Sequence, residues 1–262
     1  MEKILILGAG VYQLPLIRKA KDLGYYVIVV SIQGNYPGFA YADKVYYVDT
    51  TDKEEVLKIA IGEKISAVCT TGTDVCVPAI GWVCDNLSLK GITYDSALKS
   101  SNKWLMKKAL LEHKVRTPYG YKVTCIEDAL QYFKELGNNA VLKVVDKSGS
   151  RGIIHIQNKD ELKSAYKECM SITNKDYLLI EEYISGKEIG VSGLIQNGTI
   201  NCILPHEKIM TQVDNISIQI GHIFGNQSIN QSINLVPLRF ILCVLIILYL
   251  ILILLLMEKK YI

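Results

Sequence analysis

The chain has 262 residues, enough for one large domain or two modest ones, and half of them are apolar, which excludes a disordered chain. It carries 29 Lys and Arg against 26 Asp and Glu, and the net charge of +3 is too small to indicate a nucleic-acid partner. The seven cysteines are scattered without a C-x-x-C pair, which indicates reduced thiols rather than disulfides or a zinc site. The first residues lead directly into an apolar run and show no signal-peptide cleavage pattern. We therefore expect a globular, cytoplasmic protein.

Short apolar runs alternate with helical patterns through residues 1–95. Strands are expected at 3–8, 26–31, 44–48 and 67–71, and helices at 14–23, 52–60 and 77–87. Strands and helices that alternate at short spacing form a parallel, doubly wound sheet, with ligands at the carboxyl ends of the strands. The sequence thus predicts an α/β, Rossmann-like first domain over residues 1–95.

The glycine turn Gly8-Ala9-Gly10 follows the first expected strand and could place backbone amides against a phosphate. A dinucleotide site also needs a third glycine, where this chain has Gln13, and an acid at the end of the second strand, where it has Ser31. We therefore interpret the glycines as a tight turn required by the fold, and a dinucleotide oxidoreductase is the weaker reading.

A second domain is predicted over residues 96–230. It begins with a long helix-forming stretch at 96–112, in which Ser101-Asn102-Lys103 opens a helix. Strands follow at 119–124, 140–145, 153–156 and 177–181, and helices at 127–136 and 159–170. Two more extended segments lie between 188 and 203, and Asn197-Gly198 between them is a hairpin signal. Beyond about Asp214 the pattern loosens into polar, Asn-rich sequence.

Two basic features suit a polyphosphate. Lys143 lies inside an expected strand and precedes a basic loop that contains Ser148, Gly149, Ser150, Arg151 and Gly152. A strand lysine supplies a fixed charge for phosphate oxygens, and a glycine loop offers backbone amides. Lys103 near a helix start could also reach an anion, whereas most of the lysines of this helix, which include Lys107, Lys108 and Lys114 behind it, are expected to be solvated. Taken alone, this loop fits a solvated hairpin loop as well as it fits a phosphate-binding loop.

The segment from Ile180 to Glu188 carries three carboxylates, on Glu181, Glu182 and Glu188. Acidic side chains suit ribose hydroxyls, and an extended hinge can read adenine through one backbone carbonyl and one amide. A charged edge strand is the alternative for this segment by itself.

The order and spacing of these features resemble the ATP-grasp superfamily with its preceding Rossmann-like domain, in particular the carbamoyl-phosphate-synthase-like and biotin-carboxylase-like carboxylate ligases. The resemblance covers residues 3–210 and rests on ILGAGVYQLPLIRKAKDLGYYVIVVS, ADKVYYVDTTD, SNKWLMKKALLEHKVRTPYGY, VLKVVDKSGSRGI and LLIEEYISGKEIGVSG. It implies that Lys103 and Lys143 hold ATP phosphates, that Ser148–Gly152 cover them, and that Glu181–Ile184 form the adenine hinge. Glu182 and Ile184 would contribute main-chain contacts, and Glu188 would bind the ribose.

The same resemblance implies a small carboxylate substrate and a ligase that passes through an acyl phosphate. Magnesium is expected for this superfamily, with acidic and asparagine ligands late in the large domain. From 214 to 262 the acids are Asp214 and Glu258, so we find no magnesium ligands and expect a C-terminally truncated, incomplete ATP-grasp domain with impaired activity. The alternative is a non-catalytic, membrane-tethered nucleotide-binding protein; the oligomeric state and the nucleophile are not predicted.

The predicted hydrophobic segment, residues 235–257, contains 18 successive apolar residues from Phe240 to Met257. As a helix this run would be about 27 Å long and would nearly span a bilayer core. A transmembrane helix, a frameshifted translation and a buried core helix are the three readings, and we favour the frameshift. If the segment is native, membrane association is expected.

Overall fold

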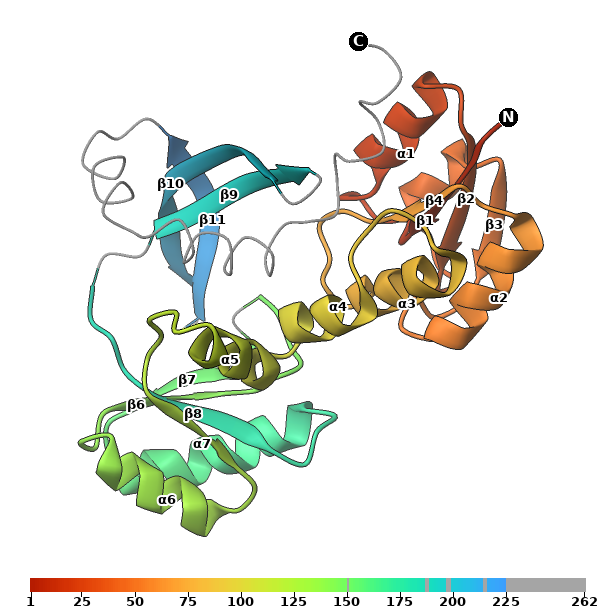
Figure 1. The fold of residues 1–262 in the computed structure, drawn as a ribbon. Helices are drawn as coiled ribbons and strands as arrows, with labels where there is room; N and C mark the ends of the chain where they lie inside the picture. The colour runs from red at the N-terminus through yellow and green to blue at the C-terminus, as the bar shows by residue number, and fades with distance from the viewer. Residues whose placement is uncertain (150, 187–188, 197–198, 214–215, 225–262) are drawn as a thin grey trace. The chain divides into compact units, whose positions relative to one another are not determined.

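The structure is a computed structural model that describes residues 1–149, 151–186, 189–196, 199–213 and 216–224 (Figure 1). The chain divides into two compact units. Residues 1–101 form the first together with 194–201, and residues 102–193 form the second together with the described part of the chain from 202 onward. The predicted boundary at 95 falls inside helix α4 (Tyr94–Ser101), which packs on α3 (Val77–Leu87) of the first unit.

The first unit is a parallel sheet of four strands with helices on both faces (Figure 1). The strand order β3-β2-β1-β4 and the parallel pairing confirm the predicted doubly wound α/β arrangement. Its elements are β1 (Lys3–Leu7), α1 (Leu14–Asp22), β2 (Tyr26–Ser31), a 3-10 helix (Pro37–Tyr41), β3 (Lys44–Tyr47), α2 (Lys53–Glu63), β4 (Ala67–Cys69), α3 (Val77–Leu87) and α4 (Tyr94–Ser101).

The central strands of this sheet are buried on both faces, as their continuous apolar runs require. Ile4 and Ile6 of β1 pack with Ile17 of α1, whereas Leu5 and Leu7 pack with the layer of α2, α3 and α4. Successive side chains of a strand point to opposite faces, so one strand contributes to two cores.

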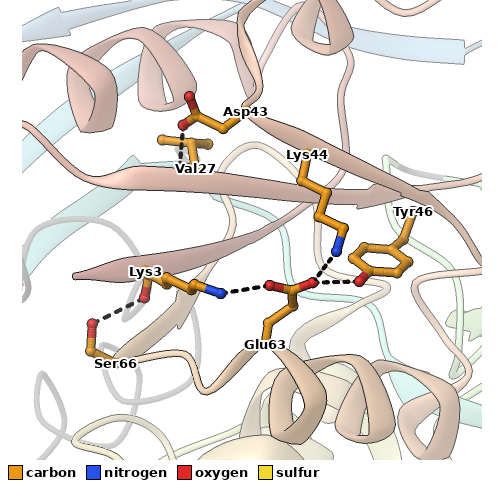
Figure 2. A network of polar contacts seen from close by, with 7 residues as sticks. All are labelled: Lys3, Val27, Asp43, Lys44, Tyr46, Glu63 and Ser66. Atoms are coloured by element: carbon orange, nitrogen blue, oxygen red, sulfur yellow. Dashed lines mark hydrogen bonds and ion pairs between the residues drawn. The ribbon is translucent and has the colours of Figure 1, made fainter. Parts of the chain in front are cut away.

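A buried carboxylate ties the start of two strands to the end of α2 (Figure 2). The side chain of Glu63 is 8% exposed and forms ion pairs with Lys3, at 2.8 Å, and with Lys44. The hydroxyl of Tyr46 donates a hydrogen bond to the same carboxylate. Hydrogen bonds from Lys3, Lys44 and Tyr46 lower the pKa of Glu63 to about 2, even though burial acts in the opposite direction.

The second unit contains an antiparallel sheet with the strand order β5-β8-β6-β7. Its core includes residues of α6 and α7, which cover one face of the sheet (Figure 1). The elements are α5 (Lys103–Glu112), β5 (Gly120–Val123), α6 (Ile126–Glu135), β6 (Ala140–Lys143), β7 (Ile153–Ile156), α7 (Lys159–Ile172) and β8 (Leu178–Glu182).

The helix-forming stretch at 96–112 is divided at Asn102 into α4 and α5, and α5 confirms the helix that is predicted to open at Ser101-Asn102-Lys103. Asn102 has an extended backbone, and its side-chain oxygen accepts hydrogen bonds from the amides of Trp104 and Leu105. This is the geometry of a helix N-cap, which satisfies amides that the first turn leaves without partners. The cap sets where Lys103 begins the new helix.

A three-stranded sheet of β9 (Ile189–Gln196), β10 (Thr199–Val213) and β11 (Ile216–Phe224) follows in the order β11-β10-β9. Strands β9 and β10 confirm the two extended segments that the sequence predicts. Strand β11 lies beyond Asp214, where the sequence pattern as a whole loosens. It pairs antiparallel with β10, and its sequence alternates isoleucine with a polar residue at 216–220, which is the period of a strand.

The predicted apolar helix and the hydrophobic segment 235–257 lie outside the described residues. Among the helices that the structure describes, none has the length and apolar character needed to cross a membrane.

Candidate nucleotide-binding site

Strands β6 and β8 place Lys143 and Glu181 on one face of the second sheet. In the register of these strands Val141 lies opposite Glu181 and Lys143 opposite Leu179, so that Lys143 and Glu181 are diagonal neighbours. Their ammonium and carboxylate groups form an ion pair. The intervening Leu142 and Ile180 point to the other face and belong to the core with α6 and α7. The strand alternation therefore separates a charged face from an apolar one.

Lys107 of α5 supplies a second cation to the same carboxylate. Its Nζ lies 2.6 Å from Glu181 Oε1, and the two side chains are 2% and 6% exposed. Lys107 also donates to Thr117 Oγ1 at 3.1 Å and to the carbonyl oxygen of Pro118. Lys107 is therefore not one of the solvated lysines that the sequence predicts in this helix. Its spacing of four residues from Lys103 places both lysines on one helix face, and that signal could have found it.

The lysine at the start of α5 meets the basic loop. The backbone amide of Lys103 donates to the carbonyl oxygen of Val145 at 3.1 Å, and its Nζ donates to the carbonyl oxygen of Lys147. Lys103 is thereby held beside the loop that starts after β6. The structure brings together two features that are 40 residues or more apart in the sequence, as the phosphate-site hypothesis requires.

The loop between β6 and β7 is fixed at both of its ends. Gly149 and Gly152 both have a φ of +67°, a left-handed conformation that favours glycine. Val144 donates to the carbonyl oxygen of Gly152 at 2.8 Å, and Arg151 Nε donates to that of Ser148 at 3.1 Å. The predicted loop residue Ser150 lies outside the described residues.

Asp146 joins this loop to the end of α7. Its carboxylate accepts hydrogen bonds from Thr173 Oγ1 at 2.7 Å and from the amide of Asn174 at 2.9 Å. Burial would raise the pKa of Asp146, but these hydrogen bonds and the charge of Lys147 outweigh it, so the pKa lies below its usual value. Asp146 therefore stays ionised at neutral pH and holds the start of the loop in place.

The expected hinge is the chain that leaves β8. The amide of Glu182 donates to the carbonyl oxygen of Tyr119 at 2.9 Å, and the Glu182 carboxylate accepts from the amide of Tyr119 at 2.8 Å. The side chain of Glu182 is thus engaged by the fold itself. Ile184 is 61% exposed, and the predicted ribose ligand Glu188 lies outside the described residues.

In the first unit, Gln13 occupies the glycine turn. The amide of Gly10 donates to Gln13 Oε1 at 3.0 Å, and Gln13 Nε2 donates to the carbonyl oxygen of Thr71. Gln13 is only 6% exposed. The backbone donor that a dinucleotide phosphate would need already has a side-chain partner, which favours the interpretation of these glycines as a structural turn.

No group of three His, Cys, Asp or Glu side chains that could hold a metal ion occurs within the part of the chain that the structure describes. The predicted absence of magnesium ligands after 214 concerns residues that lie largely outside this part.

Residues 101–215 match the family described as phosphoribosylglycinamide synthetase, ATP-grasp (A) domain. Similar solved structures include phosphoribosylglycinamide synthetase from Anaerococcus prevotii, with a TM-score of 0.72 and 23% identity over 94% of this chain and 61% of that one. The biotin carboxylase domain of 2-oxoglutarate carboxylase from Hydrogenobacter thermophilus, in complex with MgADP, ADP and bicarbonate, has a TM-score of 0.72 and 18% identity over 95% and 59%. L-amino acid ligase from Bacillus licheniformis has a TM-score of 0.72 and 15% identity over 93% and 59%.

The fold and the site define a parallel α/β unit followed by an antiparallel sheet with a basic loop, a strand lysine and a buried acid. The family match assigns residues 101–215 to an ATP-grasp domain, and the solved structures share the fold of the chain. The chain spans about three fifths of the length of these three solved proteins.

Proposed function

We propose that the second unit binds ATP. Lys103, Lys143 and the loop Ser148–Gly152 would hold the phosphates, and the backbone of Glu182 and Ile184 would contact the adenine. The observation that supports this most directly is the pairing of Lys143 with Glu181 on one sheet face, next to the start of the hinge. Two cations share one carboxylate there, so the group carries a surplus positive charge that suits phosphate oxygens.

The chemistry of the remaining site residues fits ATP as well. The Nζ of Lys103 is held beside the loop by its hydrogen bond to the Lys147 carbonyl oxygen, and Gly149 faces open space, which leaves room for a ligand to approach the backbone there. Glu188 is proposed as the ribose ligand on sequence grounds alone. Binding of magnesium together with ATP is proposed from the resemblance to the superfamily, and no residue of the chain is assigned as its ligand.

We further propose that the protein is related to the ATP-dependent ligases that join a small carboxylate to an amine through an acyl phosphate. The biotin carboxylase domain bound to MgADP and bicarbonate, and the L-amino acid ligase, support this class. Bound ATP would supply the phosphoryl group, and the lysines would orient it and neutralise its charge. The acid and the amine are not assigned.

The test compares Lys143→Ala with Lys163→Ala in the full chain. Lys163 lies on α7, its ammonium pairs with Asp160, and it carries the same charge as Lys143. Calorimetric titration with ATP should show at least tenfold weaker binding for Lys143→Ala and unchanged binding for Lys163→Ala. Equal affinities of the two variants would refute the site.

A second measurement concerns turnover. ADP release that depends on an added acid and an added amine supports the ligase. ATP binding without such release supports the non-catalytic alternative.

A further inference from the structure

Tyr183 lies between the two hinge residues proposed to contact adenine, and its ring stacks on a histidine from another strand. The rings of Tyr183 and His155 have centroids 3.8 Å apart and planes inclined by 16°. His155 belongs to β7, which is separated from β8 by β6 in the sheet order. The stack therefore links the end of β8 to the edge strand of the sheet.

Asn139, the residue before β6, closes a ring of contacts with this pair. Its side-chain oxygen lies 2.7 Å from His155 Nε2, and its main-chain oxygen accepts a hydrogen bond from the amide of Tyr183 at 3.3 Å. Each of the three residues therefore contacts the other two. With Nε2 protonated, the imidazole donates to the Asn139 amide oxygen and is fixed in its plane.

The other side of the hinge is held in a different way. Glu182 and Tyr119 are joined by two hydrogen bonds, both to the backbone of Tyr119, so no substitution of the Tyr119 side chain removes them directly. Tyr183 is held by its backbone hydrogen bond to Asn139 and by the stack of its ring on His155. Replacing His155 thus removes the contact that fixes the Tyr183 side chain and leaves the bonds between Glu182 and Tyr119 intact.

We propose that His155 is a positioning residue that sets the strength and base selectivity of nucleotide binding by fixing Tyr183 and, through it, the backbone of Glu182 and Ile184. This inference rests on the proposed ATP site. An extended hinge reads a base through a carbonyl and an amide whose directions must both be right, because hydrogen bonds weaken steeply when misaligned. Partial loss of two such bonds corresponds to roughly tenfold in affinity.

The experiment measures binding of ATP, GTP and inorganic tripolyphosphate to the full chain and to three variants. His155→Ala removes the stack and the bond to Asn139, whereas His155→Phe keeps an aromatic ring for the stack. Tyr132→Ala is the matched control, since it removes the stack of Tyr121 and Tyr132, with centroids 4.1 Å apart, elsewhere in the same unit.

We expect His155→Ala to bind ATP roughly tenfold more weakly, to lose most of its preference for ATP over GTP, and to bind tripolyphosphate within twofold of the parent. His155→Phe should lie between the parent and His155→Ala. Tyr132→Ala should bind all three ligands like the parent, even if its melting temperature falls.

Unchanged ATP affinity in His155→Ala, or an equal loss for ATP and tripolyphosphate, would overturn the role of His155 while the ATP site stands. Failure of the parent chain to bind ATP would overturn the proposed function, and the role of His155 with it.

Discussion

Replacing Glu63 with glutamine removes the charge that holds Lys3, Lys44 and Tyr46 together in the first unit (Figure 2). The pKa of Glu63 falls from 4.5 to about 2 in the folded chain. At about 1.4 kcal/mol per pKa unit this corresponds to about 3 kcal/mol without screening. Lys3 and Lys44 are 36% and 46% exposed, and solvent screens such pairs. We therefore expect a loss of about 1–2 kcal/mol for Glu63→Gln at pH 7.

The pH dependence of this loss follows from the direction of the pKa shift. The folded pKa of Glu63 is depressed, so between pH 4.5 and about 2 the unfolded chain binds more protons than the folded chain. The stabilisation is fully present above the unfolded pKa and disappears as the pH falls through the folded value. The difference in unfolding free energy between the parent and Glu63→Gln should accordingly shrink from pH 5 downward and vanish near pH 2.

The assay uses the fact that each unit contains one of the two tryptophans, Trp82 in α3 and Trp104 in α5. In a Trp104→Phe background, urea unfolding followed by Trp82 fluorescence reports the first unit alone. Glu55→Gln is the control, because Glu55 pairs with Lys58 on the exposed surface of α2, and we expect at most about 0.5 kcal/mol there. A Glu63→Gln loss that is no larger than the control, or that is constant from pH 7 to 3, would refute the reasoning.

Two further predictions concern the second unit. Lys107→Met removes a buried ion pair and leaves Lys143 as the ion-pair partner of Glu181. Chemical denaturation should show that the free energy of unfolding falls by about 2–4 kcal/mol. A decrease below about 1 kcal/mol would show that the pair is not buried in solution. Gly120→Ala would place a Cβ 2.7 Å from Glu181 Cγ and 2.8 Å from the Ile180 carbonyl oxygen. The free energy of unfolding should fall by about 1–3 kcal/mol, and ATP binding should weaken. A Cβ at Gly186 would face open space, so Gly186→Ala should change neither the unfolding free energy nor the affinity for ATP in a calorimetric titration.

The alternation of strands and helices in the first unit was readable from the sequence because those strands are apolar throughout and the helices have apolar faces. Strand β2, from Tyr26 to Ser31, has the predicted bounds, and α1 differs by one residue from the prediction. The local period of apolar residues depends only on which side chains must be buried, so it can be read without knowing which elements pack against them. The start of α5 was readable at Ser101-Asn102-Lys103, whereas the structure decided that α4 ends just before it and that the Asn102 side chain caps α5.

The candidate site divides in the same way. The sequence by itself determined that a strand lysine, a glycine loop and an acidic segment occur in the order and at the spacing typical of ATP-grasp proteins. Only the tertiary structure decided that Lys107 is buried against Glu181, that Glu182 is engaged by Tyr119, and that His155 stacks on Tyr183. These contacts join residues that are 28 to 74 positions apart, because strand register and helix packing bring them together, and neither can be derived from local sequence patterns.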